Sequence, residues 1–139
     1  MKAELLTVLV GAGLLVTTAP VFAHHSFAAE FDGAKTVHLE GTVTKLEWEN
    51  PHIHFLMDAK GADGKVVNWD LEMGSPNALS RQGVSRHSMN PGDKIIVDGF
   101  RAKDGSNLAS ARTVTFSDGR KVFAGSADDG GPGSTSGKQ

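Results

Sequence analysis

The sequence predicts an all-β fold for the middle of the chain. Between residues 35 and 125 the hydrophobic residues alternate mostly with a period of two, as in strands that bury one face. Gly, Pro and Asp-Gly signals interrupt this alternation where turns are expected. Helix signals are confined to one short segment, residues 75–83. Together these observations predict five strands, with one short helix between the third and the fourth.

The first strand is expected in "KTVHLEGTVTKLEW", residues 35–48. Its alternation changes parity between Gly41 and Lys45, so that Trp48 faces the side opposite to Val43. A change of parity within one strand indicates a bend or a bulge.

The second and third strands are expected at residues 52–59 and 66–73, joined by the hairpin loop "GADGK". Gly64 suits a left-handed position in that loop. The inward side chains are then Ile53, Phe55, Met57, Val67, Trp69, Leu71 and Met73.

The second half of the domain begins with the helix. Ser75 is a candidate N-cap with Pro76 at the first helical position, and Gly83 is a candidate terminator. Strand four is expected at residues 94–102, and residues 108–125 supply strand five and a final hairpin.

This element order matches an OB-fold, a small and partly open five-stranded barrel. The bent first strand agrees with it, because one long curved strand serves both halves of such a barrel. Other small barrels and a sandwich also fit five strands in a domain of this size. We therefore predict an OB-fold-like barrel over residues 35–125.

The start of the chain resembles an export signal. Residues 5–22 are apolar or small without a charge, Lys2 precedes them, and Ala23 ends a small-x-small cleavage pattern. The length is also close to that of a membrane anchor, but glycines, threonines and a proline dilute its apolarity. We predict that residues 1–23 are a cleaved signal peptide and that the mature protein is periplasmic or secreted.

Composition bounds the rest of the chain. The 139 residues carry a net charge of −2 and no cysteine, which argues against nucleic-acid binding and excludes disulfides and thiolate sites. Residues 24–34 form a polar and aromatic lead-in to the domain. Residues 126–139 contain no large apolar side chain and are predicted to be a disordered tail.

Several motifs resemble those of an uncharacterised bacterial family of exported small β-barrel proteins. They are the "AHHSF" start, "EGTVTKLEWENPH", "NWDLEMGSPNAL", "NPGDK" and "DGSNLASAR", and they span residues 23–125. Met89 and Asn90 stand where a leucine and a lysine are typical of the family. The resemblance implies an exported β-domain of unknown function and supplies no catalytic residues.

The first candidate site is the mature N-terminus. Cleavage after Ala23 makes His24 the first residue, so its amine and its imidazole can chelate one metal ion. With a further nitrogen from another histidine such as His25, this arrangement suits Cu(II). The alternative is a solvated terminus, and cleavage elsewhere would remove the amine ligand.

The second candidate site is "NPHIHF", where His52 and His54 lie on one face of the second strand. Pairing the hairpin about Ala62 places His54 opposite Asp70, and pairing it about Asp63 places His54 opposite Glu72. Two histidines beside a carboxylate suit zinc, copper or nickel, and cross-strand charge pairing on a solvated face is the alternative.

Other candidate groups are weaker. Met57 and Met73 have the inward parity, so core packing is expected of them rather than Cu(I) binding, whereas Met89 lies in a loop. His38 and His87 have no partner nearby in the sequence and are expected at the surface.

Two functions follow from these candidates. The first is an exported metal-binding module, with copper favoured over zinc or nickel, that uses His24, His25, His52 and His54 and is supported by Asp70 and Glu72. The second is a module that binds a partner protein or a small polar ligand on strands two and three without a metal. No catalytic motif is present, and the open face expected for Asp70 and Glu72 gives no reason for a raised pKa.

Overall fold

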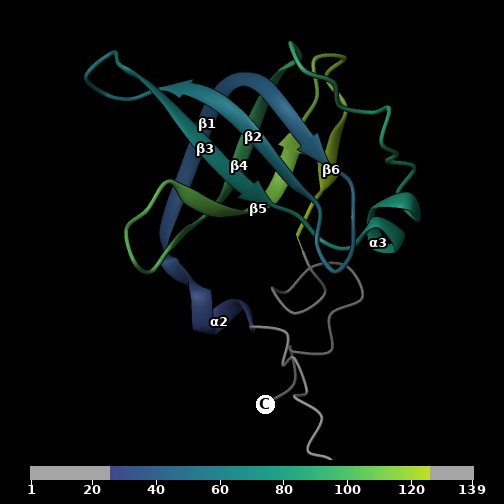
Figure 1. Cartoon of the computed structure of the whole chain (residues 1–139), viewed down its shortest axis with the longest axis horizontal. Coiled ribbons are helices and arrows are strands. Elements are labelled where there is room, and N and C mark those ends of the chain that lie inside the picture. The colour runs from purple at the N-terminus through teal and green to yellow at the C-terminus, as the bar shows by residue number, and fades with distance from the viewer. Residues whose placement is uncertain (1–25, 126–139) are drawn as a thin grey trace, which may run out of the picture.

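The computed structural model describes residues 26–125, which form one six-stranded sheet with two short helices (Figure 1). The strands are β1 (Phe31–Glu47), β2 (His54–Lys60), β3 (Val66–Glu72), β4 (Lys94–Ala102), β5 (Leu108–Thr115) and β6 (Lys121–Phe123). Helix α2 (Phe27–Glu30) precedes the sheet, and α3 (Pro76–Ser80) lies between β3 and β4. The predictions of an all-β fold and of the helix position are confirmed. The sheet has six strands rather than five, because β6 is the second arm of the final hairpin.

Three predictions lie outside the described residues. They are the signal peptide at residues 1–23, the metal ligands His24 and His25, and the tail at residues 126–139.

The long strand β1 organises the sheet. Its first part pairs with β4 and its last part with β2, both antiparallel, and Gly41 pairs with Ala59 on one side and with Ile95 on the other. The register shifts between Val43 and Lys45, which confirms the predicted irregularity. β1 begins at Phe31, inside the predicted lead-in of residues 24–34, because Phe31 is buried and pairs with β4.

The strand order is β3-β2-β1-β4-β5-β6, and β3 also pairs with β5 in parallel through Asp70–Glu72 and Leu108–Ser110. That extra pairing brings β3, at one end of this order, beside β5, the last strand but one at the other end. Within the described residues, the first part of β3, residues 66–69, has β2 as its only strand neighbour. Val66 in this part is 62% exposed.

The core lies on the face predicted from the alternation. Ile53, Phe55, Met57 and Leu71 are fully buried, whereas Val67, also expected inside, is only half-buried. Core packing is confirmed for two of the methionines, and the third, from the loop after α3, is buried with them: Met57, Met73 and Met89 all belong to the core.

The predicted caps and turns also form. The Ser75 hydroxyl accepts a hydrogen bond from the Ala78 N–H at 3.3 Å, and Pro76 opens α3. Gly83, three residues past the end of α3, and Gly64, in the β2–β3 hairpin, have φ of 77° and 78°. At these two positions glycine avoids the strain that a side chain would cause.

The double pairing of β1 gives a stability prediction. A Cβ atom at Gly41 would lie 2.2 Å from the Asp58 carbonyl oxygen, and that backbone atom is held in the β1–β2 ladder. Gly41→Ala should therefore lower the free energy of unfolding by about 2–3 kcal/mol in a urea titration. Gly33→Ala is the control, since its nearest neighbour would be 4.0 Å away, and equal effects of the two changes would contradict this account.

Candidate functional site

The β2–β3 hairpin sets the geometry of the candidate site. His54 pairs with Glu72, which confirms the register about Asp63 and shows that the one about Ala62 is wrong. The ladder continues past His54, because the Met73 N–H donates to the Ile53 carbonyl at 2.7 Å. His54 is therefore held in the ladder as the first residue of β2, and His52 directly precedes the last bonded residue, Ile53. This end of β2 and β3, opposite the turn that joins them, is the one nearer α2 (Figure 1).

Each histidine holds a carboxylate through the same ring atom. His52 Nδ1 lies 2.9 Å from Glu72 Oε1, and His54 Nδ1 lies 2.9 Å from Asp70 Oδ1. His54 Nε2 is also 3.7 Å from Glu72 Oε2. The structure thus brings together four of the residues predicted for this site, and Glu72 lies between the two imidazoles.

Glu72 is less exposed than its strand face suggested. Its side chain is only 16% exposed, and burial, opposed by the charges of His52 and His54, raises the pKa of its carboxyl. The expectation that this face gives no reason for a raised pKa is wrong for Glu72. Glu30 at the end of α2 adds to the same upward shift of the pKa.

His54 has a raised pKa for a different reason. The hydrogen bond from its ring to Asp70 is the largest cause, and partial burial works against it. Because an ionised carboxylate only accepts, Nδ1 is the nitrogen that carries the proton in this pair. The second ring nitrogen, Nε2, then faces Glu72.

Two further carboxylates were missed from the sequence. Glu47 on β1 is the cross-strand partner of His54, and its charge also raises the His54 pKa. The β1–β2 register would have identified it. Glu30 has no comparable signal, because its position depends on how α2 docks.

The lead-in is anchored near this site. The ring of Phe27 lies 5.6 Å from that of Phe31 and 5.5 Å from that of Phe100. The Lys103 N–H donates to the Glu30 carbonyl at 2.9 Å, and the Lys103 ammonium donates to the carbonyl of Ala28. α2 ends with Glu30, which is close enough to Glu72 to affect the pKa of the Glu72 carboxyl.

His38 and His87 both lie at the surface, as expected. The expectation that His38 has no partner nearby in the sequence is wrong, since its Nε2 lies 3.7 Å from Glu40 Oε1. A second partner lies sixty residues away, with His38 Nδ1 2.6 Å from Asp98 Oδ1. This hydrogen bond lowers the pKa of Asp98 and raises that of His38.

Two absences can be stated for residues 26–125. They contain no group of three or more His, Asp or Glu side chains arranged to hold a metal ion. In the same residues, no helix is both long enough and apolar enough to cross a membrane.

Comparison with known proteins places the chain in a family. The model of a family of unknown function, DUF6152, matches residues 12–111, which is most of the chain. The chain belongs to this family. The match ends within β5, so β6 lies outside the matched range. No curated protein and no solved structure matches this chain.

The Asp70–His54 contact gives a prediction with a defined sign. Asp70→Asn should lower the pKa of His54 toward its ordinary value of 6.5, as followed by an NMR pH titration of the ring protons. The raised pKa of His54 stabilises the folded state at any pH below the pKa of His54 in the unfolded chain. This contribution is lost as the pH rises through the pKa of His54 in the folded protein. The variant should therefore be destabilised more at pH 5.5 than at pH 9.

Asp58→Asn is the matched control, because Asp58 lies on the outward face of β2 and bonds Asn68 rather than a histidine. A His54 pKa that does not move in Asp70→Asn, or that moves equally in the control, would contradict this assignment.

Proposed function

We propose that this chain is an exported small binding protein that carries a transition-metal ion at the α2 end of β2 and β3. The observation that supports this most is the position of His54 between Asp70 and Glu72, with its Nε2 atom 3.7 Å from Glu72 Oε2. We propose His54 Nε2 and Glu72 Oε2 as two ligands of one ion.

The separation of these two atoms suits a shared ion. Metal bonds to imidazole nitrogen and to carboxylate oxygen are about 2.0–2.2 Å long, so two ligands at a tetrahedral angle lie about 3.4 Å apart. A small rotation of either side chain closes the difference from 3.7 Å. A carboxylate on Nδ1, as Asp70 is here, orients a metal-binding imidazole and raises its basicity.

The remaining ligands are proposed from the sequence. His52, held by Glu72, and the predicted N-terminal residues His24 and His25 are the candidates. Their proposed role draws support from the docking of α2, because Glu30 affects the pKa of Glu72 and follows His25 by only five residues. An N-terminal amine and several imidazoles favour Cu(II), with Zn(II) and Ni(II) as alternatives.

Charge around the site supports a cation as the ligand. Four carboxylates lie close enough in this region to interact through their charges with His52, with His54 or with one another: Glu30, Glu47, Asp70 and Glu72. A cation would offset the mutual repulsion of the carboxylates, which an anionic or neutral ligand would leave in place.

We further propose that the sheet closes into an OB-fold-like barrel. The support is the parallel pairing of β3 with β5, which would complete a ring of five strands, with β6 as an addition. In an OB-fold the surface of strands two and three is a ligand platform, and His54 lies on that surface. Export through the predicted signal peptide would place this domain in the periplasm or outside the cell.

A metal-independent interaction module is the second candidate. It is favoured by one observation, namely that residues 26–125 alone hold no group of three or more metal-ligating side chains. In that case the outward face of β2 and β3 would bind a partner protein or a small polar ligand, and the histidine–carboxylate pairs would be cross-strand contacts.

A metal titration separates the two candidates. The untagged mature chain beginning at His24 should bind one equivalent of Cu(II) or Zn(II) tightly, followed by calorimetry and by the Cu(II) spectrum. His54→Ala and Glu72→Gln should each weaken this binding by about tenfold or more, because each removes a proposed ligand. His87→Ala is the matched control, as His87 is exposed and makes no carboxylate contact within the described residues. If His87→Ala weakens metal binding as much as His54→Ala does, the metal-independent module is favoured.

Proton competition gives a further prediction. Because the pKa of His54 is raised, protons compete with the metal at a higher pH than at a solvated histidine. Affinity for Zn(II) should therefore fall by about tenfold or more between pH 7.5 and pH 5.5. An affinity that is unchanged over this range would exclude histidine ligation.

A further inference from the structure

A second histidine repeats the arrangement around His54. His38 Nδ1 lies 2.6 Å from Asp98 Oδ1, and His38 Nε2 lies 3.7 Å from Glu40 Oε1. The corresponding distances at His54 are 2.9 Å to the aspartate and 3.7 Å to the glutamate. In both places an aspartate holds Nδ1 while a glutamate oxygen stands beside Nε2.

The aspartate of the second arrangement is itself held in place. The Thr113 hydroxyl donates to Asp98 Oδ2 at 3.2 Å, and the Lys121 ammonium lies 3.7 Å from the same oxygen. Asp98 and Thr113 are cross-strand partners on β4 and β5, and His38 pairs with Asp98 from β1. The orientation of the His38 ring is therefore determined by three adjacent strands.

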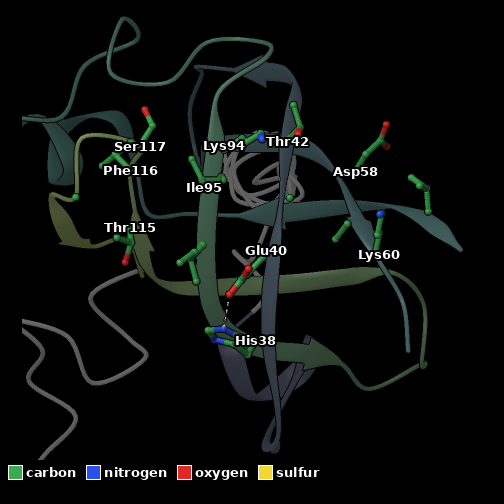
Figure 2. A pocket seen from close by; sticks show the side chains of 15 residues that line it. His38, Glu40, Thr42, Asp58, Lys60, Lys94, Ile95, Thr115, Phe116 and Ser117 are labelled. Carbon is green, nitrogen blue, oxygen red and sulfur yellow. Dashed lines mark ion pairs between the residues drawn. The ribbon is translucent and has the colours of Figure 1, made fainter. Parts of the chain in front are cut away.

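His38 and Glu40 help to line an open hollow on the sheet surface. This hollow has a volume of about 1030 Å³ and is lined by residues of all strands from β1 to β5 and of the turn after β5, with the two side chains together at one side of it (Figure 2). The side chain of His38 is 62% exposed and that of Glu40 is 72% exposed. An ion held between them would have room for water or for ligand atoms of another molecule.

We propose that His38 Nε2 and Glu40 Oε1 form a second, exposed site for a divalent transition-metal ion, oriented by Asp98. The protein supplies two ligands, and water or a small chelating ligand in the hollow fills the remaining positions. With only two protein ligands the site binds less tightly than a complete first shell and exchanges its ion more readily.

This site is independent of the one proposed at His54. The two lie on different strand pairs, His38 facing β4 and His54 facing β3, and they share no residue. Either proposed site can therefore be absent while the other binds metal, and variants of His38 partners and of His54 distinguish the two cases.

The test uses the mature chain labelled with nitrogen-15 and titrated with ZnCl₂. Long-range proton–nitrogen correlation spectra report on each imidazole nitrogen separately. The expected result is a saturable shift of His38 Nε2 at zinc concentrations that leave His87 unaffected. Glu40→Gln and Asp98→Asn should each weaken the His38 response by about tenfold, the first by removing a ligand and the second by releasing the ring.

Three controls make the outcome decisive. The response at His38 should persist in His54→Ala, which removes the first proposed site. Asp118→Asn changes an exposed aspartate that contacts Arg120 and not a histidine, and it should leave the response unchanged. Circular dichroism of Asp98→Asn checks that the fold is retained. A His38 response no stronger than that of His87, or one insensitive to Glu40→Gln, would overturn the proposal.

Discussion

The fold depends on one strand being shared between two halves of the sheet. β1 pairs with β4 along its first part and with β2 along its last part, and Gly41 has neighbours on both sides. A side chain at Gly41 would collide with the backbone of Asp58 and with Met57. The absence of a Cβ atom therefore lets β1 approach β2 closely where the strand changes its partner. The β1–β2 register at this contact also places His54 opposite Glu47, while the β2–β3 hairpin places it opposite Glu72.

Partial burial gives the histidine cluster its electrostatic character. A carboxylate that loses water is costly to keep charged, and the imidazoles beside it reduce that cost. Glu72 shows both effects, since burial raises its pKa while His52 and His54 oppose the rise. The exposed pair of His38 and Asp98 resembles His54 rather than Glu72, because a hydrogen bond rather than burial is the largest influence on both pKa values. The two arrangements are alike in geometry and unlike in solvation.

Much of the fold could be predicted because its determinants are local. Alternation along β2 and β3 correctly assigned Phe55, Met57 and Leu71 to the core, and the bounds of β4 agree with its apolar run. The histidine–carboxylate contacts were predictable as two alternatives, since the turn geometry that selects one register was ambiguous in "GADGK". What depends on distant segments was not predictable. The burial of Glu72, the approach of Glu30 and the pairing of His38 with Asp98 all depend on tertiary packing that no local pattern encodes.

Within residues 26–125, the first part of β3 has no strand neighbour on the side away from β2, and this open edge bears on the self-association of the protein. An open strand edge with an exposed valine, as at Val66, is a surface on which a second chain can add a strand. Here the open edge is only about four residues long and begins directly after Lys65, while Lys60 stands opposite Val66. In a parallel pairing of two such edges, the two copies of Lys65 would lie side by side and repel each other. The short length and the lysines thus favour colloidal stability at high concentration, and replacing both lysines with apolar residues would convert this edge into a site of self-association.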